Sequence, residues 1–127
     1  MVDNPFGPAG TSNYVQLTSF KKDGTPVGTP LWAALDGGRL YIWTVADSWK
    51  VKRIRRNPAV TVAPCDVRGK LKGEAVNATA TVLDEAGSDR VRGLIKRRYG
   101  IQGLLVVLGS QLRRGKNATV GIEITVT

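Results

Sequence analysis

The first half of the chain is divided by short turn sequences into runs with the period of β-strands. Tyr14–Phe20 (YVQLTSF) alternates with a period of two and is followed by Lys22–Gly24 (KDG). Asp-Gly accepts the positive φ angles of a tight turn at little cost, so this segment predicts a β-hairpin. The next run, Thr25–Leu35, contains two prolines. Because proline cannot donate to a sheet ladder, we expect a free edge or a break around Gly28–Pro30.

Four further runs, rich in β-branched and apolar residues, also have the character of strands. They cover residues 39–45, 59–65, 70–83 and 118–126. About six strands with turn-sized connections predict a mainly β fold, a small antiparallel barrel over residues 14–127. Residues 1–13 contain several prolines and glycines and are expected to form an irregular N-terminal arm.

Late in the chain, apolar residues recur with the spacing of an α-helix. Val91, Leu94, Ile95 and Tyr99 form one apolar stripe, and Gly100 is a plausible end for that helix. A second stripe starts at residue 101 and predicts another helix that ends at Gly115. The late helices are therefore expected as insertions before the closing strand.

Composition excludes several kinds of active site. The chain of 127 residues has no histidine and one cysteine. It therefore has no Ser-His or Cys-His pair, no usual zinc site and no internal disulfide, and we expect no metal. We identify no catalytic acid or base, so an enzyme of this composition would rely on a cofactor. With no export signal and no apolar run of membrane-spanning length, we expect a cytoplasmic protein.

The charge of the chain favours anionic partners. Its net charge of +9 comes from 19 Lys and Arg against 10 Asp and Glu. Five of these bases lie between residues 50 and 56, in a segment that predicts a helix from residue 47 or 48 to Asn57. Lys50 and Lys52 then fall near the helix start, where the dipole disfavours a cation.

Two interpretations of this helix stay open. One is a solvated basic face, with Val51 and Ile54 packed inward. The other, which we favour, is a phosphate bound by the helix N–H groups, by the Ser48 hydroxyl and by the Lys50 charge. We do not expect nucleic acid as a partner, because the aromatic residues do not interleave with basic residues along the strands.

The ordered set DGTPVGTPLW (residues 23–32) and YIWTVADSWKVKRIRRNP (residues 41–58) resembles the pyridoxamine 5'-phosphate oxidase-like split β-barrel family. Within it, the chain is most similar to the actinobacterial flavin/deazaflavin oxidoreductases that use coenzyme F420. RRYGIQG (residues 97–103) and VGIEI (residues 120–124) also fit, so the likeness covers about residues 14–126.

The resemblance implies a set of cofactor-binding residues. Those expected along the deazaflavin or flavin ring are Thr29, Pro30, Leu31 and Trp32. Those expected at the cofactor phosphate are Thr44, Ser48 and Lys50, with Trp49 and Val51 beside them. Lys52 and Arg56 are weaker candidates for the phosphate or the acidic tail of F420. Arg68 and Lys70 are expected to reach the cofactor of a partner subunit.

The resemblance also implies the activity. It predicts a homodimer with the cofactor between the subunits, and hydride transfer between F420 and a small planar unsaturated substrate. The alternatives are an FMN-binding oxidoreductase of the same fold, or a basic barrel that binds a cofactor or nucleic acid without turnover. The N-terminal helix that often covers the substrate mouth in the family is short or missing here, so we expect an open groove.

Overall fold

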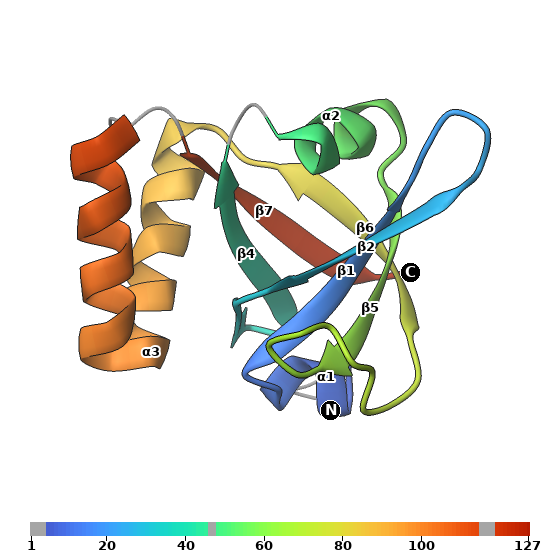
Figure 1. The fold of residues 1–127 in the computed structure, drawn as a ribbon, viewed down its shortest axis with the longest axis horizontal. Helices are drawn as coiled ribbons and strands as arrows, with labels where there is room; N and C mark the ends of the chain where they lie inside the picture. Colours follow the sequence, from blue (N-terminus) through green and yellow to red (C-terminus); the bar gives the residue numbers. More distant parts are fainter. Residues whose placement is uncertain (1–4, 46–47, 115–118) are drawn as a thin grey trace.

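A single curled sheet of seven antiparallel strands dominates the described part of the chain (Figure 1). The computed structural model describes residues 5–45, 48–114 and 119–127. The strand order in the sheet is β2-β1-β5-β6-β7-β4-β3. The strands are β1 (Tyr14–Phe20), β2 (Pro26–Leu31), β3 (Ala33–Asp36), β4 (Arg39–Val45), β5 (Ala59–Cys65), β6 (Val76–Val82) and β7 (Thr119–Val126). This confirms the expected mainly β split barrel, with one strand more than the six predicted.

The additional strand arises because the predicted strand 25–35 is broken at Trp32. β2 pairs with β1, and β3 pairs with β4 at the other edge of the sheet. One continuous stretch of chain therefore supplies both edge strands and crosses between them at Trp32. The prediction of a free edge or a break around Gly28–Pro30 is confirmed as a free edge, because both prolines lie on the edge strand β2. The break itself comes slightly later, at Trp32.

The predicted strand 70–83 was wrong in its first part. β6 begins at Val76, and the preceding residues form a loop that folds back on β5. In that loop the Lys72 N–H donates to the Pro64 carbonyl at 2.8 Å, and Leu71 forms an isolated bridge with Cys65. The loop thereby covers Cys65, which is buried as expected for a lone structural cysteine.

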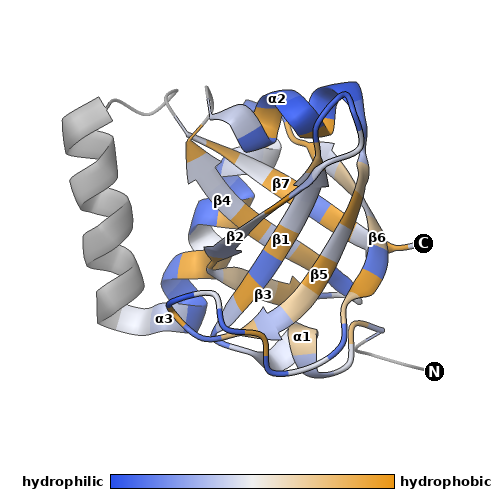
Figure 2. Ribbon diagram, turned by 45° about the vertical axis from the view of Figure 1, so that its right-hand side comes forward, coloured by the Kyte–Doolittle hydropathy of each residue, from blue (hydrophilic) through white to orange (hydrophobic). Residues whose placement is uncertain are grey.

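Every strand except the edge strand β2 contributes buried side chains to the core of the barrel. Alternate residues of β1 and β4 point inward, as in Val15, Leu17, Leu40 and Ile42. Helix α2 (Trp49–Arg56) closes one end of this core with Val51 and Ile54, as the amphipathic pattern predicted. Figure 2 shows that the rest of α2 and the adjoining hairpin between β1 and β2 are hydrophilic.

The N-terminal arm closes the opposite end of the barrel. It contains one helical turn, α1 (Pro8–Thr11), that lies against β5 and β3. Phe6 and Ala9 are each only 1% exposed and belong to the main core. The prolines and glycines of this segment gave no indication of that role.

Helix α3 (Glu85–Arg114) lies on the outer face of the sheet, beside β4 and β7. It bends at Gly100, whose φ of 60° and ψ of −136° are not helical, so the two predicted helices are confirmed as two halves of one element. The first half packs closely on β7: a Cβ at Gly121 would lie 2.6 Å from Val91 Cγ2. Within the described residues, no helix combines the length and apolar character that crossing a bilayer requires.

Candidate anion and cofactor site

The start of α2 has the geometry of an anion site. Ser48 is its N-cap, with φ −68° and ψ 157°, and its Oγ accepts a hydrogen bond from the Val51 N–H at 3.5 Å. The preceding N–H groups, of Trp49 and Lys50, have no acceptor within the helix. These groups and the positive end of the helix dipole favour a bound anion.

Lys50 adds an uncompensated positive charge to this helix start. Its side chain is half-buried, and burial lowers the pKa of Lys50, with the nearby Arg53 charge lowering it further. The ion pairs among the described residues involve Arg39, Arg90 and Arg92 and none of the bases of α2. A bound anion would therefore relieve an unfavourable charge distribution that the folded chain leaves in place.

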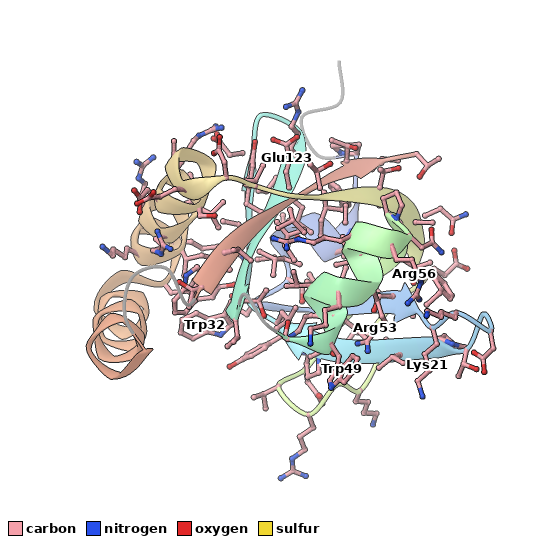
Figure 3. The ribbon with its side chains drawn as sticks, turned by 90° about the horizontal axis from the view of Figure 1, so that it is seen from above. Lys21, Trp32, Trp49, Arg53, Arg56 and Glu123 are labelled. Carbon is pink, nitrogen blue, oxygen red and sulfur yellow. The ribbon has the colours of Figure 1, made fainter. Side chains whose placement is uncertain are left out.

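A pocket of about 450 Å³ continues from this point along α2 to the β1–β2 hairpin (Figure 3). Its lining consists of Lys21, Lys22, Trp49, Arg53 and Arg56. Four of these side chains are cationic, none is acidic, and the fifth is an indole that is 72% exposed. This composition suits an extended anionic group.

The two arginines of the pocket are held in place by β1. Arg53 donates from Nε to the buried Ser19 Oγ at 2.7 Å, and Arg56 donates from Nη2 to the Phe20 carbonyl at 2.8 Å. A guanidinium has five N–H donors, so each arginine keeps donors for a ligand. Preorganised arginines lose little conformational entropy when they bind an anion.

The predicted residues of α2 and its approach fall together at this end of the barrel. Thr44 is buried at the end of β4, and the side chain of Val51 lies in the core, so Val51 can meet a ligand only through its backbone. Lys52 is exposed and its Nζ lies 4.6 Å from the centroid of the Trp49 ring. Of the predicted set, Trp49 and Arg56 line the pocket itself.

The remaining predicted residues form a second group, along β2 and the β5–β6 loop. A Cβ at Gly69 would lie 3.8 Å from Pro30 Cγ, so the loop that carries Arg68 and Lys70 passes beside β2. The Asp66 carboxylate accepts the Arg68 and Lys70 N–H groups at 2.9 Å each, which fixes the loop. Within one chain, this loop and α2 lie at opposite ends of β5 (Figure 1).

Trp32 lies where β2 ends, on the side of the sheet that faces α3. Its ring is stacked on Tyr99, with centroids 4.2 Å apart and an interplanar angle of 9°. Together with Thr29, Pro30 and Leu31, it is half-buried. Tyr41 is 2% exposed and its hydroxyl donates to Glu123 Oε2 at 3.2 Å. It is therefore part of the packing between α3 and the sheet.

Sequence reasoning missed four residues of this region. Lys21 and Lys22 belong to the hairpin, and only the tertiary structure brings them to α2. Arg53 was noted only as one of the five bases of α2. Its i, i+4 spacing from Trp49 could have indicated that the two side chains lie on the same face of the helix. Tyr99 was assigned to an apolar stripe, although a tyrosine at a helix end has a polar group to satisfy.

Solved structures with this fold have different descriptions. The chain is similar to a conserved hypothetical protein, Rv2991, from Mycobacterium tuberculosis, with 26% identity, a TM-score of 0.66 and coverage of 92% of this chain and 74% of that one. It is similar to an F420 reductase at 22% identity and TM-score 0.64, over 99% and 96% of the two chains. A FAD-binding protein from Mesorhizobium loti matches at 18% identity and TM-score 0.58, over 94% and 84%.

Family membership follows from a separate comparison of sequences. Among curated proteins, no sequence matches the chain. The profile of the pyridoxamine 5'-phosphate oxidase family, in contrast, matches residues 9–127, which include the barrel, α2 and the residues of both groups described above. The chain belongs to the pyridoxamine 5'-phosphate oxidase family.

Proposed function

We propose that the protein is an F420-dependent oxidoreductase that transfers a hydride between the deazaflavin and a small planar unsaturated substrate. The family and its fold support a cofactor of the flavin or F420 type. The observation that carries the choice of F420 is the basic pocket that extends from Trp49, next to Lys50 at the start of α2, to the hairpin.

The length and the positive charge of this basic region favour F420 over FMN. FMN ends at its phosphate, and the start of α2 with Ser48 and Lys50 would be sufficient to bind it. F420 continues beyond its phosphodiester through a lactyl carboxylate into a chain of glutamates. Four cationic side chains, in a pocket lining that contains no acidic residue, suit that continuation.

Each group of residues then has a role. Ser48, Lys50 and the first N–H groups of α2 bind the phosphate, and Arg53, Arg56 and the hairpin lysines bind the acidic tail. Residues 29–32 line the ring and exclude water from it. When bound, F420 supplies the hydride chemistry, for which this chain without histidine has no substitute.

The titration that tests this proposal compares F420 with FMN by fluorescence, at low and at moderate salt. We expect saturable binding of F420, with a lower Kd than that of FMN. The difference between the two Kd values should decrease at moderate salt, because salt screens the attraction between the glutamate tail and the basic pocket. Tighter binding of FMN would support the second candidate, an FMN-dependent oxidoreductase. Binding of neither would contradict both and direct attention to nucleic acid, whose affinity should fall steeply with salt.

Turnover separates an enzyme from a cofactor carrier. Reduced F420 bound to the protein should be oxidised by a panel of planar unsaturated acceptors faster than free reduced F420 is. Tight binding without any such acceleration would favour a protein that stores the cofactor.

We also propose that two chains pair, with the cofactor between them. Arg68 and Lys70 lie at the other end of β5 from α2 of their own chain, and in the proposed pair they would reach a cofactor held by α2 of the partner subunit. Val67 and Leu71, beside them in the same loop, are 62% and 53% exposed and would gain an apolar contact. Light scattering at micromolar concentration should give twice the 13.7 kDa chain mass, and a monomer would contradict this arrangement.

A further inference from the structure

Tyr99 connects three segments that are far apart in the sequence. Its hydroxyl donates to the Asn13 carbonyl at 2.7 Å and lies 3.1 Å from the Ala33 carbonyl. The Ala33 N–H donates to the same hydroxyl at 3.2 Å. Its ring stacks on Trp32. One side chain thus contacts the N-terminal arm, the junction of β2 with β3, and the indole at that junction.

The junction needs such a partner because the chain changes neighbours there. Up to Leu31 the backbone pairs with β1, and from Ala33 it pairs with β4. A residue between two edge strands has no continuous ladder to hold its peptide groups. The Tyr99 hydroxyl meets both the N–H and the C=O of Ala33 and replaces the missing ladder on that side.

Arg98 ties the N-terminal arm to the same place. Its Nη2 donates to the Thr11 and Ser12 carbonyls, each at 3.1 Å, and its guanidinium carbon lies 5.4 Å from the centroid of the Tyr99 ring. Gly100 then turns the helix away. The bend therefore leaves Arg98 and Tyr99 at the end of a helical segment, against the arm and the junction.

We propose that Tyr99 is a positioning residue that holds the Trp32 indole in a fixed plane, as one wall for the cofactor ring or the planar substrate. This rests on the proposed function. A near-parallel stack at 4.2 Å covers one face of the indole and restricts its rotation, while the half-buried side chain keeps its remaining surface accessible. The hydrogen bond from the Tyr99 hydroxyl to the Asn13 carbonyl joins the arm to this stack.

Two substitutions separate the ring from the hydroxyl. Tyr99→Phe keeps the stack and loses the hydrogen bonds, whereas Tyr99→Leu loses both. Arg97→Ala, at the exposed neighbouring position, is the matched control. The measurements are near-ultraviolet circular dichroism of the cofactor-free protein, the emission spectrum and Kd of bound F420, and KM against kcat for an accepted substrate.

For Tyr99→Leu we expect a changed aromatic dichroism band, a shifted emission of bound F420 and a Kd raised about three- to tenfold, the range for losing an aromatic pair. KM for the substrate should rise more than kcat falls. Tyr99→Phe should restore the emission of bound F420, and Arg97→Ala should match the wild type. If Tyr99→Leu does not fold, Trp32→Leu removes the wall itself and should shift the emission in the same way.

The outcomes distinguish this role from the proposed function. Wild-type protein that binds no F420 would overturn both. Wild-type binding with an unchanged F420 spectrum and Kd in Tyr99→Leu, despite an altered dichroism band, would leave Tyr99 with a structural role only. A Tyr99→Phe variant as impaired as Tyr99→Leu would show that the hydroxyl, and not the stack, positions the site.

Discussion

Replacing Lys50 with alanine should weaken F420 binding about 10- to 100-fold, the loss expected for one charge-assisted contact with a phosphate. The Lys50 ammonium is half-buried at the start of α2, near Arg53 and without an ion-pair partner among the described residues. Removing it from the free protein relieves repulsion, so the fold should not suffer from the lost charge. Isothermal titration with F420 and thermal unfolding of the free protein together measure both effects.

Two further variants separate the charge of Lys50 from its packing. Lys50→Met retains the apolar stem and should bind F420 as weakly as Lys50→Ala does, with a melting temperature at or above that of the wild type. Lys50→Arg should recover part of the affinity. If Lys50→Ala lowered the melting temperature by many degrees and left the Kd unchanged, the phosphate would have to lie elsewhere.

The pH dependence gives a second test of the same residue. The folded chain holds the pKa of Lys50 below that of an ordinary lysine, through burial and through Arg53. F420 affinity should therefore fall as pH rises through this lowered pKa, below the range in which exposed lysines titrate. Across the same window the stability of the free protein should rise with pH, because the unfolded chain keeps the proton longer. Both slopes should be smaller in Lys50→Met.

The sequence predicted the elements best where local pattern and tertiary structure agree. β1, β4 and β5 have the predicted bounds, since each combines a clear alternation or apolar run with a turn at its end. Ser48 and Asn57 cap α2 as expected, because N-cap chemistry and the restriction before proline act locally.

The errors arose where a distant segment decides the local structure. Residues 70–75 have strand-like neighbours but fold back on Pro64, a contact with no local signature. At the break, Ala33 is hydrogen-bonded to Tyr99, which lies 66 positions further along the chain. Phe6 enters the core from a segment whose composition is typical of a loop.

The candidate site divides in the same way. The residues at the start of α2 follow from a strand, an N-cap and a basic helix, all contiguous in sequence. The pocket could not be predicted in the same way, because it forms only where the hairpin lies beside α2, and no pattern in the sequence pairs Lys22 with Arg56. The sequence showed the positive charge of α2, but it did not show the pocket that brings this charge together with the hairpin lysines.

Reversing both hairpin lysines, Lys21→Glu with Lys22→Glu, should weaken F420 binding about 5- to 30-fold at low salt and FMN binding by less than about threefold. Each reversal replaces an attraction to the tail with a repulsion. On an exposed surface, this should weaken the binding free energy by about 0.5 to 1 kcal/mol per site. The difference between the two ligands arises because only F420 extends from the phosphate toward the hairpin. Both side chains are exposed, so the unfolding transition should be nearly unchanged.

The control for this double variant must carry the same total charge. Arg55→Glu with Arg97→Glu also lowers the net charge of +9 by four, and both positions are exposed and outside the pocket. Long-range attraction of an anion depends on total charge and is screened within about 10 Å at 0.1 M salt, whereas contact with the tail depends on position. If the two double variants lost equal affinity, the pocket would have no specific role. A loss confined to the hairpin variant, larger for F420 with more glutamates, would mean that Lys21 and Lys22 contact the tail.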